Sequence, residues 1–262
     1  MLPVEFGAVT HPGRVRPLNE DSILAAPPIF VVADGVGGSH AGEVASSVVT
    51  EEFSRLKDLD SISSDHVTAA LHRAHERVLG LNENSPNFAA TTAAGAVGVD
   101  MGPGMSYWLV FNIGDSRVYR CSAGPNRPLS QVSVDHSYVQ ELLDAGALTP
   151  EQAWSHPDKN VVTRAVGAEA EFDPDFWLMP MVPGERLIVC SDGLLNDSPG
   201  QLVKDIIKGV TDPHRATDEL LELALRCGAR DNVSVIVVDV VGDDLDSTVP
   251  MAQTVLTARN GT

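Results

Sequence analysis

Four aspartates stand next to apolar runs of the chain, and together they could supply one site with carboxylates. Asp34, Asp115 and Asp192 come shortly after such runs, and Asp231 comes just before another. A single Asp beside Gly at a strand end is usually a turn, because Gly tolerates positive φ and Asp bonds its own backbone. Packed strands can also bring their ends together, and four carboxylates cannot stay ionised at close range in a partly dry cleft without cations. The positions alone leave both interpretations open.

The residue types indicate which ion such a site would take. Carboxylates without Cys or His partners suit Mg²⁺ or Mn²⁺ rather than zinc or copper. The eight histidines form no convincing metal pair, and Glu20 and Asp21 add two more acids near the N-terminus. No protein nucleophile is convincing either. Ser191 has no His–acid pair beside it in the sequence, although distant partners stay open, and Cys190 ends an apolar run, as a buried thiol does.

The charge balance limits the classes of partner. The chain has 262 residues, with 36 acidic and 18 basic side chains and a net charge of −18. Because such a surface repels phosphate backbones and anionic lipid, we expect neither nucleic acid nor a membrane as partner. The acidity itself fits a solvated surface, converging metal ligands, or both. No run is long enough to span a bilayer and no signal peptide is evident, and three scattered cysteines indicate reduced, mostly buried thiols. We therefore expect a cytoplasmic protein.

The elements that must position these acids follow from periodicity. Apolar residues at helical spacing predict helices over residues 41–56, 65–83 and 213–227, with shorter ones over 138–145, 150–154 and 201–208. Apolar or alternating runs predict strands over 29–33, 92–99, 108–113, 118–121, 186–190 and 233–241. Helices occur in groups rather than in alternation with strands, which favours an α+β layered domain. Residues from 243 onward lack periodicity, so we expect residues 243–262 to form a loosely ordered tail.

Nine short motifs then stand in an order that resembles a known family. Among them are Arg16-Pro17-Leu18-Asn19-Glu20-Asp21, Val32-Ala33-Asp34-Gly35, Thr91-Thr92, Ile113-Gly114-Asp115-Ser116-Arg117, Asp135-His136-Ser137, Ser191-Asp192-Gly193 and Arg230-Asp231-Asn232. Each is weak alone, but their order makes chance agreement improbable. The chain resembles the metal-dependent protein phosphatases, the PPM or protein phosphatase 2C-like family, and especially its compact bacterial members. The resemblance covers roughly residues 6–240.

The resemblance implies a fold and a set of roles. The fold would be a four-layer α-β-β-α sandwich, with antiparallel sheets at its centre, within a domain of residues 1–242. The activity would be hydrolysis of phosphoserine and phosphothreonine in proteins by a water bridging two Mg²⁺ or Mn²⁺ ions, opposing a bacterial Ser/Thr kinase. In the implied site, Asp34 would bridge the two metals, the Gly35 carbonyl would bind the second metal, and Asp192 and Asp231 would bind the first. Asp115 would join Asp192 at a weaker third metal site, with Asn160 nearby. Glu20 and Asp21 would act through metal-bound waters, and Arg16 would bind the substrate phosphate.

Two features limit this assignment. Val36 stands where many relatives carry His or Met, and a His there is thought to protonate the leaving group; His40 is a weak substitute four residues on. Residues 137–168 correspond to the family's flap, which would shape substrate choice, although an ordinary helical hairpin is the simpler interpretation. Two other functions stay open: a regulatory module with the same fold and little turnover, which Val36 favours, and a metal-dependent hydrolase of small phosphoesters.

Overall fold

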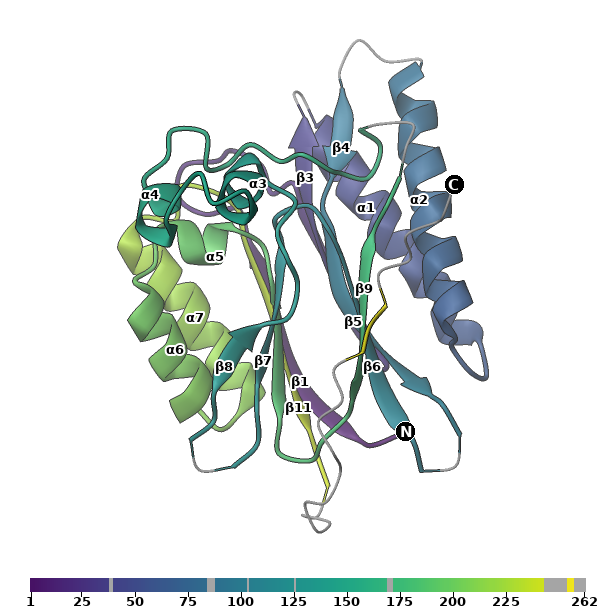
Figure 1. Ribbon diagram of the computed structural model, residues 1–262. Helices are drawn as coiled ribbons and strands as arrows, with labels where there is room; N and C mark the ends of the chain where they lie inside the picture. The colour runs from purple at the N-terminus through teal and green to yellow at the C-terminus, as the bar shows by residue number, and fades with distance from the viewer. Residues whose placement is uncertain are drawn as a thin grey trace.

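Two antiparallel β-sheets lie face to face at the centre of the protein, and helices cover the outer face of each, as Figure 1 shows for the computed structural model. The structure describes residues 1–37, 40–83, 88–102, 104–124, 126–168 and 172–242, and the backbone of 254–256. This arrangement is the predicted α+β four-layer sandwich.

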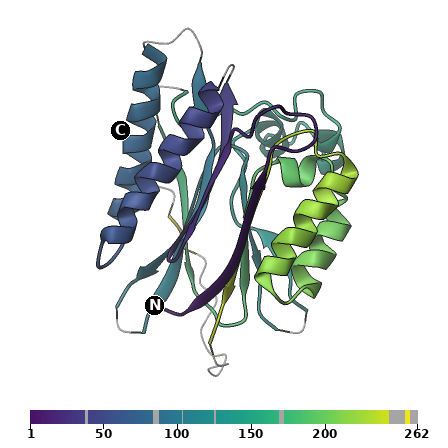
Figure 2. The ribbon, with the colours of Figure 1, turned by 180° about the vertical axis from the view of Figure 1, so that it is seen from behind.

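The first sheet has the strand order β1-β11-β10-β7-β8, and its neighbours pair antiparallel. Its strands are β1 (Val4–His11), β7 (Arg117–Cys121), β8 (Leu129–Gln131), β10 (Arg186–Cys190) and β11 (Val233–Val240). Helices α5 (Gly193–Asn196), α6 (Gly200–Gly209) and α7 (Pro213–Cys227) lie on its outer face. Figure 2 shows these layers from behind, with β1 beside α7.

The second sheet has the order β12-β9-β6-β5-β3-β2, and a short strand β4 pairs with β3. Its strands are β2 (Asp21–Ala26), β3 (Ile29–Gly37), β4 (Ala89–Thr91), β5 (Ala93–Asp100), β6 (Ser106–Ile113), β9 (Asp175–Pro180) and β12 (Thr254–Leu256). Helices α1 (Ala41–Ser54) and α2 (Ser64–Glu83), with the 3-10 turn η1 (Arg55–Asp58), cover its outer face. Helices α3 (Tyr138–Asp144) and α4 (Pro150–Trp154) stand apart from both layers, at the upper left of Figure 1.

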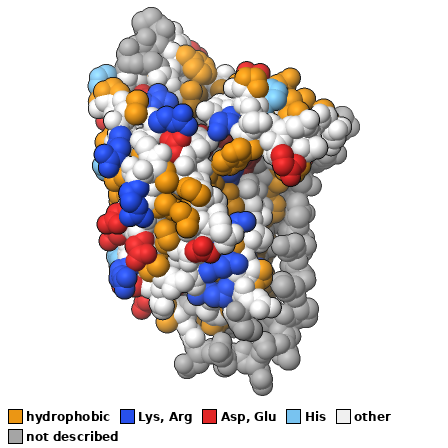
Figure 3. All heavy atoms as spheres, turned by 90° about the vertical axis from the view of Figure 1, so that its left-hand side faces the viewer, with side chains coloured by type: hydrophobic (Ala, Val, Ile, Leu, Met, Phe, Trp, Pro, Cys, Tyr) orange, Lys and Arg blue, Asp and Glu red, His pale blue; other side chains and the backbone are white. Residues whose placement is uncertain are grey.

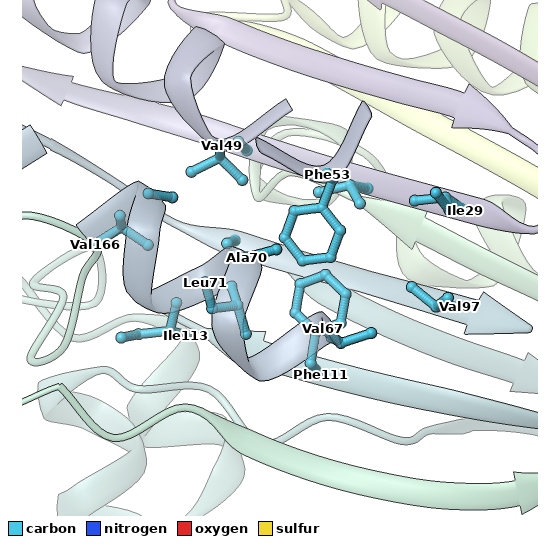
Figure 4. Packing of buried hydrophobic residues seen from close by; sticks show 14 of the residues in the cluster. Ile29, Val49, Phe53, Val67, Ala70, Leu71, Val97, Phe111, Ile113 and Val166 are labelled. Carbon is cyan, nitrogen blue, oxygen red and sulfur yellow. The ribbon is translucent and has the colours of Figure 1, made fainter. Parts of the chain in front are cut away.

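Three apolar layers hold the four structural layers together. The layer between α1, α2 and the second sheet is shown in Figure 4, where Phe53 of α1 lies over Phe111 of β6. Their rings are stacked, with centroids 4.8 Å apart and planes 11° from parallel. Between the two sheets, Phe30 and Trp108 meet edge to face at 6.0 Å. Burial of this apolar area is the main force that fixes the strand ends in place.

The predicted helices and strands are all present, but several strands are absent from the prediction. In strand β1 only Gly7 is buried, Glu5 and Thr10 are exposed and the other side chains are half-buried, so its apolar signal is weak. A Cβ at Gly7 would lie 2.4 Å from the Pro213 carbonyl oxygen, so the close approach of α7 requires a glycine there. The expected tail over 243–262 lies outside the described residues, except for the backbone of β12, which pairs with β9.

The three cysteines are free thiols; Cys121 and Cys190 are buried, whereas Cys227 is exposed. Within the described ranges, no helix combines the length and the apolar character that crossing a bilayer requires.

Candidate metal centre and active site

Asp34 lies near the end of β3, where backbone hydrogen bonds on both sides fix its position. Its N–H donates to Thr92 Oγ1 at 2.9 Å, and its carbonyl accepts from Thr92 N–H and Thr91 Oγ1, both at 2.9 Å. The pairing of β2 with β3 places Asp21 directly opposite Asp34. The two threonines, known from the sequence only as part of a motif, therefore hold the Asp34 backbone.

Gly35 is a glycine because α1 begins directly against it. A Cβ there would lie 2.2 Å from the Gly42 carbonyl oxygen and 2.6 Å from that of Glu20. The Gly35 N–H donates to the same Glu20 carbonyl at 3.1 Å, and Ser46 Oγ of α1 donates to it at 2.6 Å. These contacts hold the turn before β2 beside the end of β3.

Asp192 and Asp231 come from the first sheet, at the same end of the antiparallel β10–β11 pair. Asp192 follows β10 and starts α5, and its Oδ2 accepts from Asn196 Nδ2 at 2.8 Å. Asp231 precedes β11, and its Oδ2 accepts from Arg16 Nη2 at 2.8 Å. A Cβ at Gly193 would lie 1.9 Å from the Asn232 carbonyl oxygen, so α5 packs directly on the segment that carries Asp231.

A serine that directly follows β10 of the first sheet binds an acid of the second sheet. Ser191 Oγ donates to Asp21 Oδ2 at 2.9 Å and accepts from Ser234 N–H at 3.0 Å. The other carboxylate oxygen of Asp21, Oδ1, is buried and has no hydrogen-bond partner among the described residues. A buried acceptor without a partner is costly, so this oxygen is available to an ion or a water.

The acids perturb one another strongly. Burial and then the charges of the neighbouring acids raise the pKa of Asp34 well above its ordinary value. Burial likewise raises the pKa of Asp21 to about 7 and that of Asp115 to about 8, and Asp192 adds to both shifts. The pKa of Asp192 is raised by burial and then by Asp231. We call this set the acid cluster; its members are Asp21, Asp34, Asp115, Asp192 and Asp231.

The acid cluster fits a hard divalent cation. Its donors are carboxylate oxygens, one of them unpartnered, and a cation would relieve the mutual repulsion that raises the pKa values. In the described part of the chain, however, no three His, Cys, Asp or Glu side chains already converge as an ion cage. Instead, Asp231 is bonded to Arg16, Asp192 to Asn196 and Asp21 to Ser191, and an ion would replace some of these partners.

Arg16 lies in the segment between β1 and β2, and Asn232 anchors that segment. Asn232 Nδ2 donates to the carbonyls of Pro12 and Leu18 at 3.0 and 2.8 Å, and its Oδ1 accepts from Glu20 N–H at 2.8 Å. The side chain of Arg16 is 50% exposed, which leaves its guanidinium open to an anion from solvent. Sequence reasoning missed this role of Asn232; its place directly after Asp231 was the available signal.

Asp115 lies in the turn between β6 and β7, and a buried histidine braces that turn. Gly114 N–H donates to His136 Nδ1 at 3.2 Å, and His136 Nε2 lies 3.2 Å from Asp175 Oδ2. His136 N–H donates to the Gly114 carbonyl at 2.9 Å. The sequence placed His136 in a motif without a role, because its partner Asp175 is 39 residues away.

Comparison with known proteins places this chain in one family. A sequence model described as protein phosphatase 2C matches residues 18–226 of the chain. The chain belongs to the protein phosphatase 2C family.

Relatives in the protein phosphatase 2C family agree over most of the chain. Serine/threonine protein phosphatase PstP of Mycobacterium tuberculosis is 33% identical over 257 residues, which is 95% of this chain. The chain spans only 48% of that relative's length. Serine/threonine phosphatase stp of Listeria welshimeri is 32% identical over 243 residues, covering 88% of this chain and 93% of the relative. A crystal structure of the PstP catalytic domain in complex with two manganese ions has a TM-score of 0.81 and 31% identity, covering 92% of this chain and 100% of that one.

The segment predicted to be the flap of this protein phosphatase 2C family member contains both expected helices. Ser137 Oγ caps α3 by accepting from Gln140 N–H, and Thr149 begins α4 with a reciprocal capping box to Gln152. Three of its side chains, Tyr138, Trp154 and Val161, are 40–59% exposed. Asn160 is exposed as well, and its predicted place near a third metal stays a prediction.

Val36 and His40, the two positions considered for protonation of the leaving group, lie at the surface. Val36 is 45% exposed. His40 begins α1 with a left-handed backbone (φ 71°), and its Nδ1 lies 3.4 Å from Glu43 Oε2. The exposed imidazole is thus oriented by its own helix.

Proposed function

We propose that this protein is a metal-dependent phosphatase that hydrolyses phosphoserine and phosphothreonine in proteins. One observation carries the proposal: acids from both sheets lie together with mutually raised pKa values, beside the half-exposed guanidinium of Arg16. The names of the relatives as serine/threonine phosphatases support the same substrate class.

The acid cluster would hold two or three Mg²⁺ or Mn²⁺ ions. Asp34 and the Gly35 carbonyl, with Asp192 and Asp231, would provide the ligands of a pair, and Asp115 would join Asp192 at a third position. Glu20 and Asp21 would act through bound waters, a role that suits the unpartnered Asp21 Oδ1. When bound, such ions supply a water that ionises near neutral pH and positive charge for the phosphoryl oxygens. The manganese ions of the PstP structure support this choice of metal.

Arg16 would bind the phosphate of the substrate. Its planar guanidinium can donate two parallel hydrogen bonds to phosphate oxygens. In the free protein the group is bonded to Asp231, and this exposed pair is weak enough to exchange for a dianionic ligand. Because Asn232 anchors residues 12–20, the Arg16 segment needs to move little when the phosphate binds.

Val36 has no proton to give to the leaving alkoxide. Because Val36 is half exposed, solvent reaches this end of β3, and we propose that a water protonates the leaving group. His40 is the alternative donor, and its Nδ1 lies 3.4 Å from Glu43 Oε2.

The physiological partners would be phosphorylated proteins, including a Ser/Thr kinase that this phosphatase opposes. The three free thiols are consistent with a reducing compartment such as the cytoplasm.

The decisive experiment is phosphate release from a phosphothreonine peptide with Mn²⁺, with and without excess EDTA. We expect turnover that EDTA abolishes, and loss of turnover in Asp192→Asn. Binding of the phosphopeptide without release would instead support a regulatory module. Faster hydrolysis of nucleotides and p-nitrophenyl phosphate than of phosphopeptides would support a small-phosphoester hydrolase.

A further inference from the structure

A cavity of about 170 Å³ lies between the outer face of the first sheet and the helices that cover it. Its walls are apolar: Ile188 and Cys190 of β10, Leu194 of α5, and Val203 and Ile207 of α6, each at most 3% exposed. An engineered apolar cavity of about 150 Å³ holds one benzene molecule, so this one has room for a single ring.

One buried polar group in the cavity wall lacks a hydrogen-bond partner among the described residues. Ser198 lines it and is 2% exposed, yet its Oγ has no hydrogen-bond partner among the described residues. A hydroxyl buried in this way is costly unless a ligand or a water bonds to it. Ser198 therefore marks one wall at which a polar atom of a ligand would be bound.

The rim of the cavity adds positive charge and an aromatic ring. Lys204 of α6 is exposed at the rim and makes no ion pair with any described residue, although the chain carries a net charge of −18. Arg117 of β7 also lines the cavity, is bonded to Asp135 and is 28% exposed. Trp154 of α4 closes a further side and is 59% exposed. Figure 3 looks onto this side of the molecule, where apolar side chains (orange) lie among Lys and Arg side chains (blue).

We propose that this cavity is a binding site for a small aromatic carboxylic acid, with the ring between α6 and β10 and the carboxylate toward Ser198 and Lys204. The apolar walls and the volume select one ring, the two polar groups select an acidic end, and Trp154 offers a face for stacking. The site is separate from the acid cluster, and the proposal does not depend on phosphatase activity.

A ligand in the cavity would contact segments that carry members of the acid cluster. Leu194 and Leu195 follow Asp192 within three residues, and Arg117 follows Asp115 by two. Because α5 is a single short turn, occupation of the cavity should restrict its local opening. We therefore expect slower amide hydrogen exchange in residues 193–204 when the site is filled, and unchanged exchange in α2.

The test uses four probes that separate ring from charge: benzoate, 4-fluorobenzoate, toluene and acetate. We expect calorimetry and ligand-observed NMR to show one-to-one binding of the two aromatic acids, with dissociation constants of about 0.1–1 mM, as ligands of this size can reach. Toluene should bind more weakly, and acetate should not bind in this range. Saturable binding of acetate alone, or of none of the four probes, overturns the proposal.

Two matched pairs of variants locate the site. Val203→Phe fills the cavity from within and should weaken benzoate binding at least tenfold, whereas Leu202→Phe, at an exposed neighbour that does not line the cavity, should leave it unchanged. Should Val203→Phe fail to fold, Gly200→Phe replaces it, because a Cβ at Gly200 meets no atom within 4 Å; Gly209→Phe, equally open but outside the cavity, is its control. Ser198→Ala should weaken benzoate binding severalfold and leave toluene binding unchanged. Equal benzoate affinity in the filled variants and the wild type rules the site out.

Discussion

Ser191 Oγ donates a hydrogen bond of 2.9 Å to Asp21 Oδ2, although the two residues are 170 positions apart, one directly after β10 of the first sheet and the other at the start of β2 in the second. The same hydroxyl accepts from Ser234 N–H of β11. One buried serine therefore connects the end of β10, the start of β2 and the start of β11 at the point where the acids lie. This contact ties the fold of the sandwich to the arrangement of the acid cluster.

The first prediction concerns this serine. Ser191→Ala leaves the second oxygen of Asp21 and the Ser234 N–H without a partner in a buried place, so we expect a loss of about 1–3 kcal/mol in the free energy of unfolding. Urea denaturation measures this loss, and Ser130→Ala, at an exposed serine of β8, is the control. A Ser191→Ala protein as stable as the wild type would contradict the role given to the contact.

The second prediction concerns pH in the metal-free protein. Asp21 and Asp115 have folded-state pKa values of about 7 and about 8, whereas unfolded Asp ionises near about 3.9. Between these values the folded state keeps protons that the unfolded state has lost. The free energy of unfolding should therefore fall as pH rises from about 4 to 8, by up to about 1.4 kcal/mol per pH unit for each such group.

Two controls separate this effect from other titrations. Excess Mn²⁺ should flatten the slope, because a bound cation favours the ionised carboxylates. Asp115→Asn should reduce the slope in EDTA. Urea titrations at several pH values provide the data, and stability that rises with pH between 5 and 8 in EDTA would refute the coupling of these acids.

The third prediction concerns Arg16. Arg16→Ala should lower kcat/KM for a phosphopeptide. The expected loss of transition-state stabilisation is about 1.5–3 kcal/mol, the usual value of a hydrogen bond to a charged group. Its half-exposed contact with Asp231 contributes little to folding, so the free energy of unfolding should change by less than about 1 kcal/mol. Arg14→Ala is a matched control, since Arg14 lies in the same segment but donates to the Leu225 carbonyl. An unchanged kcat/KM in Arg16→Ala would reject the phosphate-binding role.

The fourth prediction concerns a carboxylate far from the acid cluster. Glu52 of α1 is fully buried and accepts from Arg73 Nε at 2.9 Å and Arg77 Nη1 at 2.7 Å. Burial alone would raise the pKa of Glu52, but these hydrogen bonds and the charge of Arg55 lower it overall. Glu52→Gln should lower the free energy of unfolding by about 1–3 kcal/mol. This is less than the cost of breaking a fully buried ion pair, because the arginines keep contact with water.

Unlike the acid cluster, Glu52 should have no part in catalysis. Glu52 joins α1 to α2 on the outer side of the second sheet, so kcat/KM of the folded Glu52→Gln protein should equal that of the wild type. Thermal unfolding and steady-state kinetics on the same preparation check both statements. A loss of activity greater than the loss of folded protein would show that this network extends to the site.

The layered fold was predictable where the apolar pattern is strong. Helix α7 has both its stripe and its cap in the sequence: Asp212 accepts from the N–H groups of His214 and Arg215, and Pro213 occupies the first turn. Strands β1 and β9 escaped prediction because partners, not local pattern, define them: Phe6 pairs with Val238, and Phe111 with Phe176. Strand pairing over such separations leaves little trace in either segment alone.

The sequence by itself determined the chemistry that is available: carboxylates at strand ends, an arginine near the N-terminus, no convincing protein nucleophile, and motifs in the order of one family. Only the tertiary structure decided which groups support them. The Thr92 hydroxyl binds the backbone of Asp34, and Asn232 anchors the segment that carries Arg16. His136 braces the turn that carries Asp115. In each case the two partners are distant in the chain. The physical reason is that a sequence fixes side-chain types and local spacing, whereas packing of the two sheets brings remote donors and acceptors within hydrogen-bonding distance.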